Sequence, residues 1–122
     1  MTTKPHILIC DDERGIREAL RMILEPHYLL SYVTNGEEVL EFLKTENPHL
    51  LIMDVKMPRL GGLDALPKIR LTKPKLPILI ITGYESRDVA TEALQRGATA
   101  YLTKPFERHT VAAEVRMLLH QK

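Results

Sequence analysis

The chain has 122 residues, 44% of them hydrophobic, which fits one globular domain with a core of ordinary size. Its 17 basic and 16 acidic residues leave a net charge of +1, which gives no argument for a nucleic-acid or anionic-membrane partner. No apolar run approaches the roughly 20 residues of a bilayer-spanning helix, and the single cysteine, Cys10, excludes an internal disulfide and fits a reducing, cytoplasmic location.

From the N-terminus, short apolar runs alternate with amphipathic segments. Residues 6–10 predict a buried strand, and residues 13–25 predict a helix because their apolar residues recur at i, i+3, i+4, i+7 and i+8. Residues 28–33 predict a less regular strand. An Asn-Gly turn at 35–36 is then followed by a helix over residues 37–46, which an Asn-Pro pair ends.

The middle of the chain holds the most continuous apolar runs. Residues 50–54 predict a strand buried on both faces, with Asp54 at its carboxyl end. Residues 63–72 predict a helix that contains Pro67. Because proline is tolerated in the first turn of a helix, we expect this helix to be short, late-starting or kinked. Residues 78–82 predict another buried strand.

The last part of the chain continues the alternation. Ser86 can cap a helix over residues 87–96 that turns Leu94 toward the core together with two alanines. A last strand is predicted over residues 99–103 and a last helix over residues 107–120. Strands that alternate with helices in this way imply a parallel sheet with helices on both faces.

Polar residues stand where four of the predicted strands end: Asp11 and Asp12, Asp54, Thr82 and Lys104. In a parallel sheet these ends share one edge, where ligands bind. Carboxylates about 4 Å apart repel by about 4 kcal/mol at an effective dielectric near 20, so such a cluster takes up protons or binds a cation, and magnesium suits it. With a hydroxyl and an ammonium added, the set predicts a phosphoryl site. Asp11 and Asp12 can also cap the helix that follows them.

Motifs at these strand ends stand in a fixed order: Asp11-Asp12, Asp54 with Met57-Pro58 and Gly61-Gly62, Thr82-Gly83, and Lys104-Pro105. In this order they resemble the receiver domain of bacterial two-component response regulators. The resemblance covers the whole chain and implies an α/β, flavodoxin-like, doubly wound parallel sheet of five strands in the order 2-1-3-4-5, with five helices. It also implies one receiver domain over residues 1–122, with any effector domain absent from this chain.

The resemblance assigns roles to the metal-binding and phosphoryl-accepting positions. It implies that Asp54 is the phosphoacceptor, and that Asp12 and Asp54 bind Mg²⁺ directly. Asp11 would bind the ion through water, and the backbone carbonyl of Lys56 would complete the protein's share.

Other positions would contact the phosphoryl group or respond to it. The resemblance implies that Lys104 pairs with this group, that Thr82 bonds it, and that Tyr101 is a switch aromatic, although a half-buried tyrosine on an edge strand is also a common structural residue. It favours a cis bond before Pro105. Gly83 would leave room beside the phosphoryl group.

Two residues particular to this sequence are predicted at the mouth of the site with Gly83. Lys56 stands two residues after Asp54, and Tyr84 stands two residues after the strand-end threonine. We expect their side chains to obstruct the approach of water and so to lengthen the life of the phosphoryl group.

The resulting hypothesis is a signalling domain with self-phosphorylation and autophosphatase chemistry. It would take a phosphoryl group from a sensor histidine kinase or phosphotransfer protein and switch conformation on the face of the fourth helix, fifth strand and fifth helix, where it can also dimerise. One alternative is an enzyme that forms an aspartyl phosphate on small phosphoesters, but such enzymes carry a second acid where this chain has Lys56. Another is a binding module that has lost phosphorylation.

Overall fold

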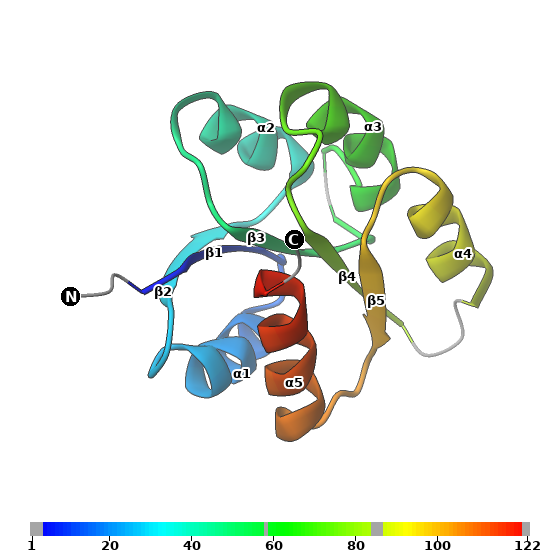
Figure 1. Ribbon diagram of the computed structural model, residues 1–122. Helices are drawn as coiled ribbons and strands as arrows, with labels where there is room; N and C mark the ends of the chain where they lie inside the picture. The colour runs from blue at the N-terminus through cyan, green and yellow to red at the C-terminus, as the bar shows by residue number, and fades with distance from the viewer. Residues whose placement is uncertain (1–3, 58, 84–86, 121–122) are drawn as a thin grey trace.

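A computed structural model describes residues 4–57, 59–83 and 87–120 and shows three layers (Figure 1). The central sheet has five parallel strands in the order β2-β1-β3-β4-β5, as predicted. Helices α1 and α5 cover one face, and α2, α3 and α4 cover the other. The elements, in chain order, are β1 His6–Cys10, α1 Arg14–Leu24, β2 Leu29–Val33, α2 Gly36–Thr45, β3 Leu50–Asp54, α3 Gly62–Thr72, β4 Ile78–Thr82, α4 Arg87–Gln95, β5 Ala100–Thr103 and α5 Arg108–Leu119.

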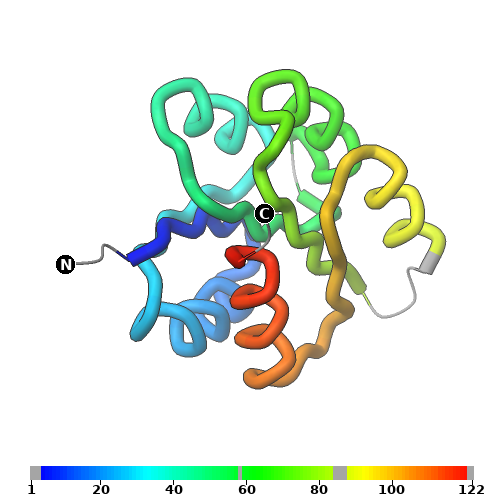
Figure 2. The backbone as a smooth tube through the Cα atoms, viewed as in Figure 1, coloured from blue at the N-terminus to red at the C-terminus, as the bar shows by residue number. Residues whose placement is uncertain are grey.

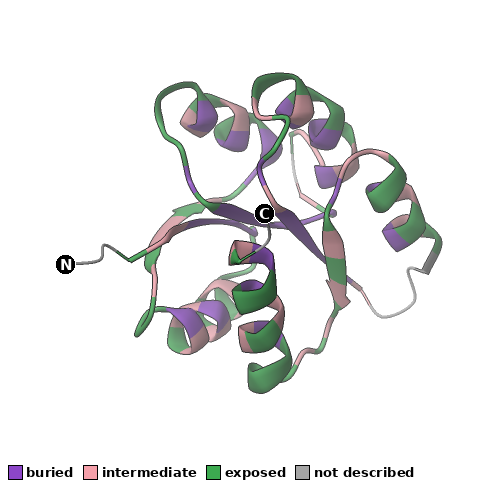
Figure 3. Ribbon diagram, viewed as in Figure 1, coloured by how far each residue is buried: buried purple, intermediate pink, exposed green. Residues whose placement is uncertain are grey.

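The apolar strand runs are continuous because both faces of the sheet are covered. Along β1, Ile7 and Ile9 pack under α1 and α5, whereas Leu8 and Cys10 pack under the helices of the other face. Strands β3 and β4 are buried along their whole length, and only the edge strands β2 and β5 carry exposed residues (Figure 3). The irregular pattern predicted for β2 therefore reflects its place at the edge.

The Asn-Gly pair predicted as a turn is instead the start of α2. The side chain of Asn35 accepts a hydrogen bond of 2.9 Å from the backbone N–H of Glu38 and so caps the helix. Gly36 is the first helical residue, and its N–H donates to the carbonyl of Leu60 at 2.9 Å. A Cβ at this position would lie 2.4 Å from that oxygen, so the close approach of the two backbones requires glycine.

Helix α3 is neither short nor late-starting, although Pro67 lies inside it. It runs for 11 residues from Gly62. Because proline has no N–H, the carbonyl of Leu63 cannot take the usual bond from residue 67. The guanidinium of Arg96, from the end of α4, donates to that carbonyl at 3.1 Å instead. A partner distant in the sequence thus satisfies the group that the proline leaves free.

We expect Arg96 and Pro67 to be energetically coupled. Arg96→Ala should lower the free energy of unfolding by about 1–2 kcal/mol, because the Leu63 carbonyl loses its donor. In a Pro67→Ala background the helix supplies its own N–H, so the same change should cost about half as much. Urea unfolding of the four proteins measures this coupling. Lys68→Ala, one residue along α3, should instead be additive with Pro67→Ala, and an equally additive Arg96→Ala would refute the compensation.

The prediction that Leu94 points inward is wrong. Leu94 is 41% exposed, whereas Ala90 and Ala93 are buried and Val89 packs against the same core. The inner face of α4 is formed by Val89, Ala90 and Ala93, and Leu94 falls outside that face. The cap predicted at Ser86 lies outside the described residues.

Every strand leads into a helix that returns the chain to the same end of the sheet, as the backbone trace shows (Figure 2). The carboxyl ends of all five parallel strands therefore lie along one side of the sheet, which is distinct from the lateral edges formed by β2 and β5. We call this side the carboxyl edge. Among the helices that the structure describes, none combines the length and apolar character that a bilayer crossing needs.

Candidate functional site

The carboxyl edge of the sheet brings together the polar residues that the sequence singled out. Cys10 pairs with Met53, which places Asp11, just after β1, next to Asp54, the last residue of the adjacent strand β3. The next strand ends in Thr82, whose carbonyl accepts a bond of 2.8 Å from the backbone N–H of Lys104. These strand registers fix the relative positions of the candidate groups.

Three carboxylates meet at this edge. Asp11, Asp12 and Asp54 each offer an oxygen within 4.8 Å of the others. Asp11 and Asp54 are only 2% and 4% exposed, whereas Asp12 is exposed. Burial is the largest influence on Asp11 and raises the pKa of its carboxyl, the backbone N–H of Glu13 opposes that rise, and the charge of Asp54 adds to it. An all-oxygen set with an accessible member fits a hard divalent ion such as Mg²⁺.

Lys104 lies among these carboxylates. Its Nζ atom is 2.9 Å from Glu13 Oε1, 3.2 Å from Asp54 Oδ2 and 3.4 Å from Asp11 Oδ2, and its side chain is only 17% exposed. Burial works to lower the pKa of Lys104, but the contacts with Glu13 and Asp54 outweigh it and leave that pKa raised. The ammonium is therefore a fixed positive charge beside the Asp54 carboxylate.

The sequence reasoning missed Glu13. It placed this residue as the start of a helix, but α1 begins at Arg14 and the side chain of Glu13 turns to Lys104. The signal available was weak: Glu13 is the third of three consecutive acids. The expected helix cap by Asp11 or Asp12 is also replaced, because Glu13 holds the N-cap position and its N–H donates to Asp11 Oδ1 at 2.8 Å.

Thr82 supplies a buried hydroxyl. The residue is fully buried, and its Oγ1 has no hydrogen-bond partner among the described residues. An unpaired buried hydroxyl costs about 1–3 kcal/mol, so its presence at the carboxylate edge calls for an explanation. A donor that serves an anionic oxygen bound beside Asp54 provides one, and the side chains present thus fit both a divalent cation and a phosphoryl group.

The loop between β3 and α3 folds tightly against the end of β3. Gly62 donates its N–H to the carbonyl of Val55 at 2.9 Å. A Cβ on Gly62 would lie 2.5 Å from the Asp54 carbonyl and 2.8 Å from Val55 Cα. Both contacts are to backbone, which cannot give way as a flexible side chain can. Glycine at position 62 thus allows the helix to start directly against the backbone of Asp54 and Val55.

We expect Gly62→Ala to destabilise the protein by about 1–3 kcal/mol, because the end of β3 must move to admit the methyl group. Urea unfolding measures this loss. The matched control is Gly15→Ala in α1, because a Cβ at position 15 would meet nothing within 4 Å. This substitution should raise the stability of the helix by roughly 0.5–1 kcal/mol. Equal effects of the two substitutions would contradict the close approach.

The residues predicted at the mouth of the site are only partly described. Lys56 is exposed, and its N–H lies 3.4 Å from Asp54 Oδ1. Gly83 is half-buried at the end of β4, and Tyr84 lies outside the described residues. A hollow of about 310 Å³ opens beside Lys56, between the β3–α3 loop and α4. Tyr101 is 40% exposed on the edge strand β5.

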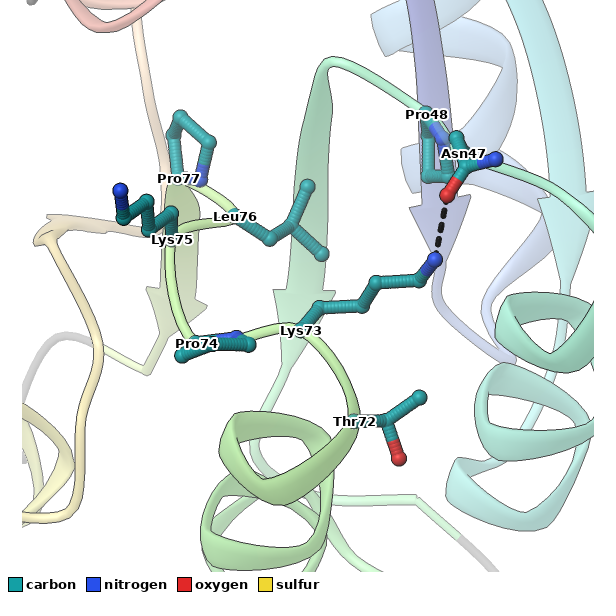
Figure 4. Close-up of a pocket in the computed structure, with 8 residues that line it drawn as sticks. All are labelled: Asn47, Pro48, Thr72, Lys73, Pro74, Lys75, Leu76 and Pro77. Atoms are coloured by element: carbon teal, nitrogen blue, oxygen red, sulfur yellow. Dashed lines mark hydrogen bonds between the residues drawn. The ribbon is translucent and has the colours of Figure 1, made fainter.

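Other hollows lie away from the carboxylates. One of about 340 Å³ is at the opposite edge of the sheet, lined by Pro48, Pro74 and Pro77 and crossed by a hydrogen bond from Lys73 to Asn47 (Figure 4). Another, of about 680 Å³, lies between α1 and α5. No aspartate or glutamate lines either one, so the described hollows do not rival the carboxylate edge as a cation site.

Comparison with known proteins identifies the family. The family model for the response regulator receiver domain matches residues 7–116. The chain belongs to the response regulator receiver domain family. The cis peptide bond between Lys104 and Pro105, which the resemblance favoured, is present in this receiver domain.

The relatives agree with this assignment. The response regulator MprA of Mycobacterium ulcerans is 39% identical over 116 residues, which are 94% of this chain and 50% of that protein. The receiver domain therefore spans about half the length of the curated relatives it matches. A CheY-like receiver domain protein from Methanospirillum hungatei has a TM-score of 0.89 at 28% identity, over 96% of this chain and 94% of that one. Full-length FixJ from B. japonicum has a TM-score of 0.90 at 30% identity, over 98% and 60%.

Proposed function

We propose that this receiver domain is a phosphoacceptor that takes a phosphoryl group from a histidine kinase or phosphotransfer protein onto Asp54. The single observation that carries the proposal is the arrangement around Asp54. A nearly buried carboxylate lies beside a fixed ammonium, at the same strand edge as two further carboxylates and a buried hydroxyl that has no partner in the described part of the chain. A receiver domain that had lost phosphorylation would have no use for this set.

Asp11, Asp12, Asp54 and the carbonyl of Lys56 would hold Mg²⁺, with Asp11 acting through water. When bound, the ion neutralises charge that develops on the transferring phosphoryl oxygens. An Asp54 oxygen attacks phosphorus, the bond from phosphorus to the donor breaks, and an acyl phosphate forms. Lys104 pairs with a phosphoryl oxygen, and Thr82 donates its hydroxyl to another.

Asp54 is positioned before the reaction begins. The bond from Lys104 Nζ to Asp54 Oδ2 and the contact from the N–H of Lys56 to Oδ1 engage both carboxylate oxygens. This orientation lowers the entropy cost of an in-line attack. Lys56, Gly83 and Tyr84, which the sequence predicts at the mouth of the site, would then control how readily water reaches the acyl phosphate, and with it the rate of autodephosphorylation.

Phosphorylation would be transmitted to the face formed by α4, β5 and α5. Thr82 would move toward the phosphoryl group, and Tyr101, now 40% exposed, would turn inward to fill the space. Two states that differ by a few contacts can be biased by one charged group. This face would bind a partner or a second copy of the domain. Amide shift mapping with beryllium fluoride should locate the changes there, and changes confined to α1 and α2 would refute the proposed output face.

The test of the proposed function is incubation with acetyl phosphate and Mg²⁺, followed by intact mass measurement. We expect one phosphoryl group per chain, lost again with time. The family assignment disfavours the alternative enzyme. Such an enzyme needs an acid two residues after its nucleophile, and this chain has Lys56 at that position. Multiple turnover of a generic phosphoester such as p-nitrophenyl phosphate would favour that alternative, and an unchanged mass would refute the phosphoacceptor.

A further inference from the structure

The ammonium of Lys104 is shared between the buried carboxylates and Glu13, an acid outside the expected set. An ammonium has three N–H donors, and three carboxylates lie within 3.4 Å of Nζ. The nearest is Glu13, at 2.9 Å, although it is separated from Lys104 by 91 residues in the chain. The other two, Asp11 and Asp54, belong to the candidate magnesium site.

The carboxylate of Glu13 has no role in its own helix. Glu13 is the N-cap residue of α1, but its side chain makes no capping hydrogen bond. Its backbone is fixed by the N–H bond to Asp11 Oδ1, and the Arg17 guanidinium donates to the Asp11 carbonyl at 2.9 Å. This turn holds the Glu13 carboxylate, which caps no helix N–H, against the ammonium of Lys104 at the rim of the site. The side chain of Glu13 is 60% exposed there.

Lys104 and a divalent ion would compete for the same two carboxylates. Lys104 contacts one oxygen each of Asp11 and Asp54, and these two carboxylates are also candidate ligands of the divalent ion. Two cations at one pair of carboxylates repel each other strongly in a buried site. Lys104 therefore needs a second anionic partner to which it can withdraw while the ion binds.

We propose that Glu13 is a positioning residue that draws Lys104 toward the rim of the site and so favours the binding of Mg²⁺, at the expense of the hold of Lys104 on the phosphoryl group. The inference rests on the proposed function. It gives Glu13 opposite effects on the two ligands: its charge helps the cation and restrains the lysine that the phosphoryl group needs.

The test is Glu13→Gln, which keeps the size of the side chain and removes its charge. Calorimetric titration with Mg²⁺ alone should show affinity lowered roughly threefold to fivefold, the range expected for loss of a partly exposed ion pair. Titration with beryllium fluoride at saturating Mg²⁺ should show affinity raised by a similar factor. The ¹⁵N signal of the Lys104 ammonium should also move in the absence of any ligand. Glu107→Gln, an exposed acid near Lys104 in the sequence with no ion pair to it in the described residues, is the matched control.

A merely structural role would lower both affinities together, and a general charge effect would appear equally in Glu107→Gln. Either result, with normal binding by the wild type, overturns the role of Glu13 and leaves the phosphoacceptor in place. A wild type that binds neither Mg²⁺ nor beryllium fluoride overturns the proposed function and this inference with it.

Discussion

In Asp54→Asn, acetyl phosphate should no longer increase the mass of the protein. The amide is nearly the same size as the carboxylate but lacks the charge and nucleophilicity needed to attack phosphorus. Labelling should fall below detection, a loss of at least about 1,000-fold, because in the proposed reaction Asp54 supplies the bond-forming atom itself. The fold should remain, because Lys104 keeps its contacts with Asp11 and Glu13.

Asp88→Asn provides the control for this substitution. Asp88 is exposed in the first turn of α4, so its removal changes the net charge equally without touching the carboxylate edge. The Asp88→Asn protein should be labelled by acetyl phosphate to the same extent as the wild type. Full, persistent labelling of Asp54→Asn at any residue other than a neighbouring hydroxyl would show that Asp54 is not the acceptor.

The order of strands and helices along the chain could be predicted because burial produces a periodic pattern of apolar residues, whereas the strand order within the sheet was implied by the resemblance to receiver domains. Strands β3 and β4 are buried on both faces, and their sequences are unbroken apolar runs. The stripe along α1 likewise predicted a helix that buries Leu20 and Leu24. Right-handed crossovers then leave few ways to arrange alternating strands and helices.

Two of the errors fall where a residue distant in the sequence overrides a local rule. Pro67 was expected to make α3 short, late-starting or kinked, but the helix runs for 11 residues and Arg96 satisfies the carbonyl that the proline leaves free. The Asn35-Gly36 pair is a common turn sequence, yet the approach of Leu60 makes it a helix start. No periodicity or turn preference in a single sequence encodes a partner that lies 24 or more residues away.

The candidate site was predictable to the extent that its residues end strands. Strand ends in a parallel sheet converge whatever the side chains do, and the contacts of Lys104 with Asp11 and Asp54 follow from that convergence. Glu13 belongs to a turn, and its direction depends on where α1 begins. A shift of one residue in the helix start decides whether Glu13 faces Lys104 or solvent, and sequence patterns do not resolve helix starts that finely.

Asp12→Ala should sharply weaken Mg²⁺ binding and, with it, phosphorylation. Among the described residues, Lys104 forms ion pairs with Asp11, Glu13 and Asp54 but not with Asp12. Asp12 is thus the exposed carboxylate of the cluster with which Lys104 forms no ion pair, and in the proposed site it would be the ligand most accessible to a divalent ion. If the ion contributes about 3 kcal/mol to the transition state, its loss slows labelling about 100-fold.

Three measurements separate a metal effect from damage to the site. The initial labelling rate of Asp12→Ala should be about 100-fold below that of the wild type at moderate Mg²⁺, and should partly recover as the concentration is raised, because Asp11 and Asp54 remain. The wild type in excess chelator should be slowed to a similar degree. Asp88→Ala should be labelled at the same rate as the wild type. Asp12→Ala should unfold at a temperature no lower than that of the wild type, because the substitution removes an exposed acid from a cluster of like charges. Labelling of the wild type at the same rate in chelator and in Mg²⁺ would mean that the three carboxylates do not act through a metal ion.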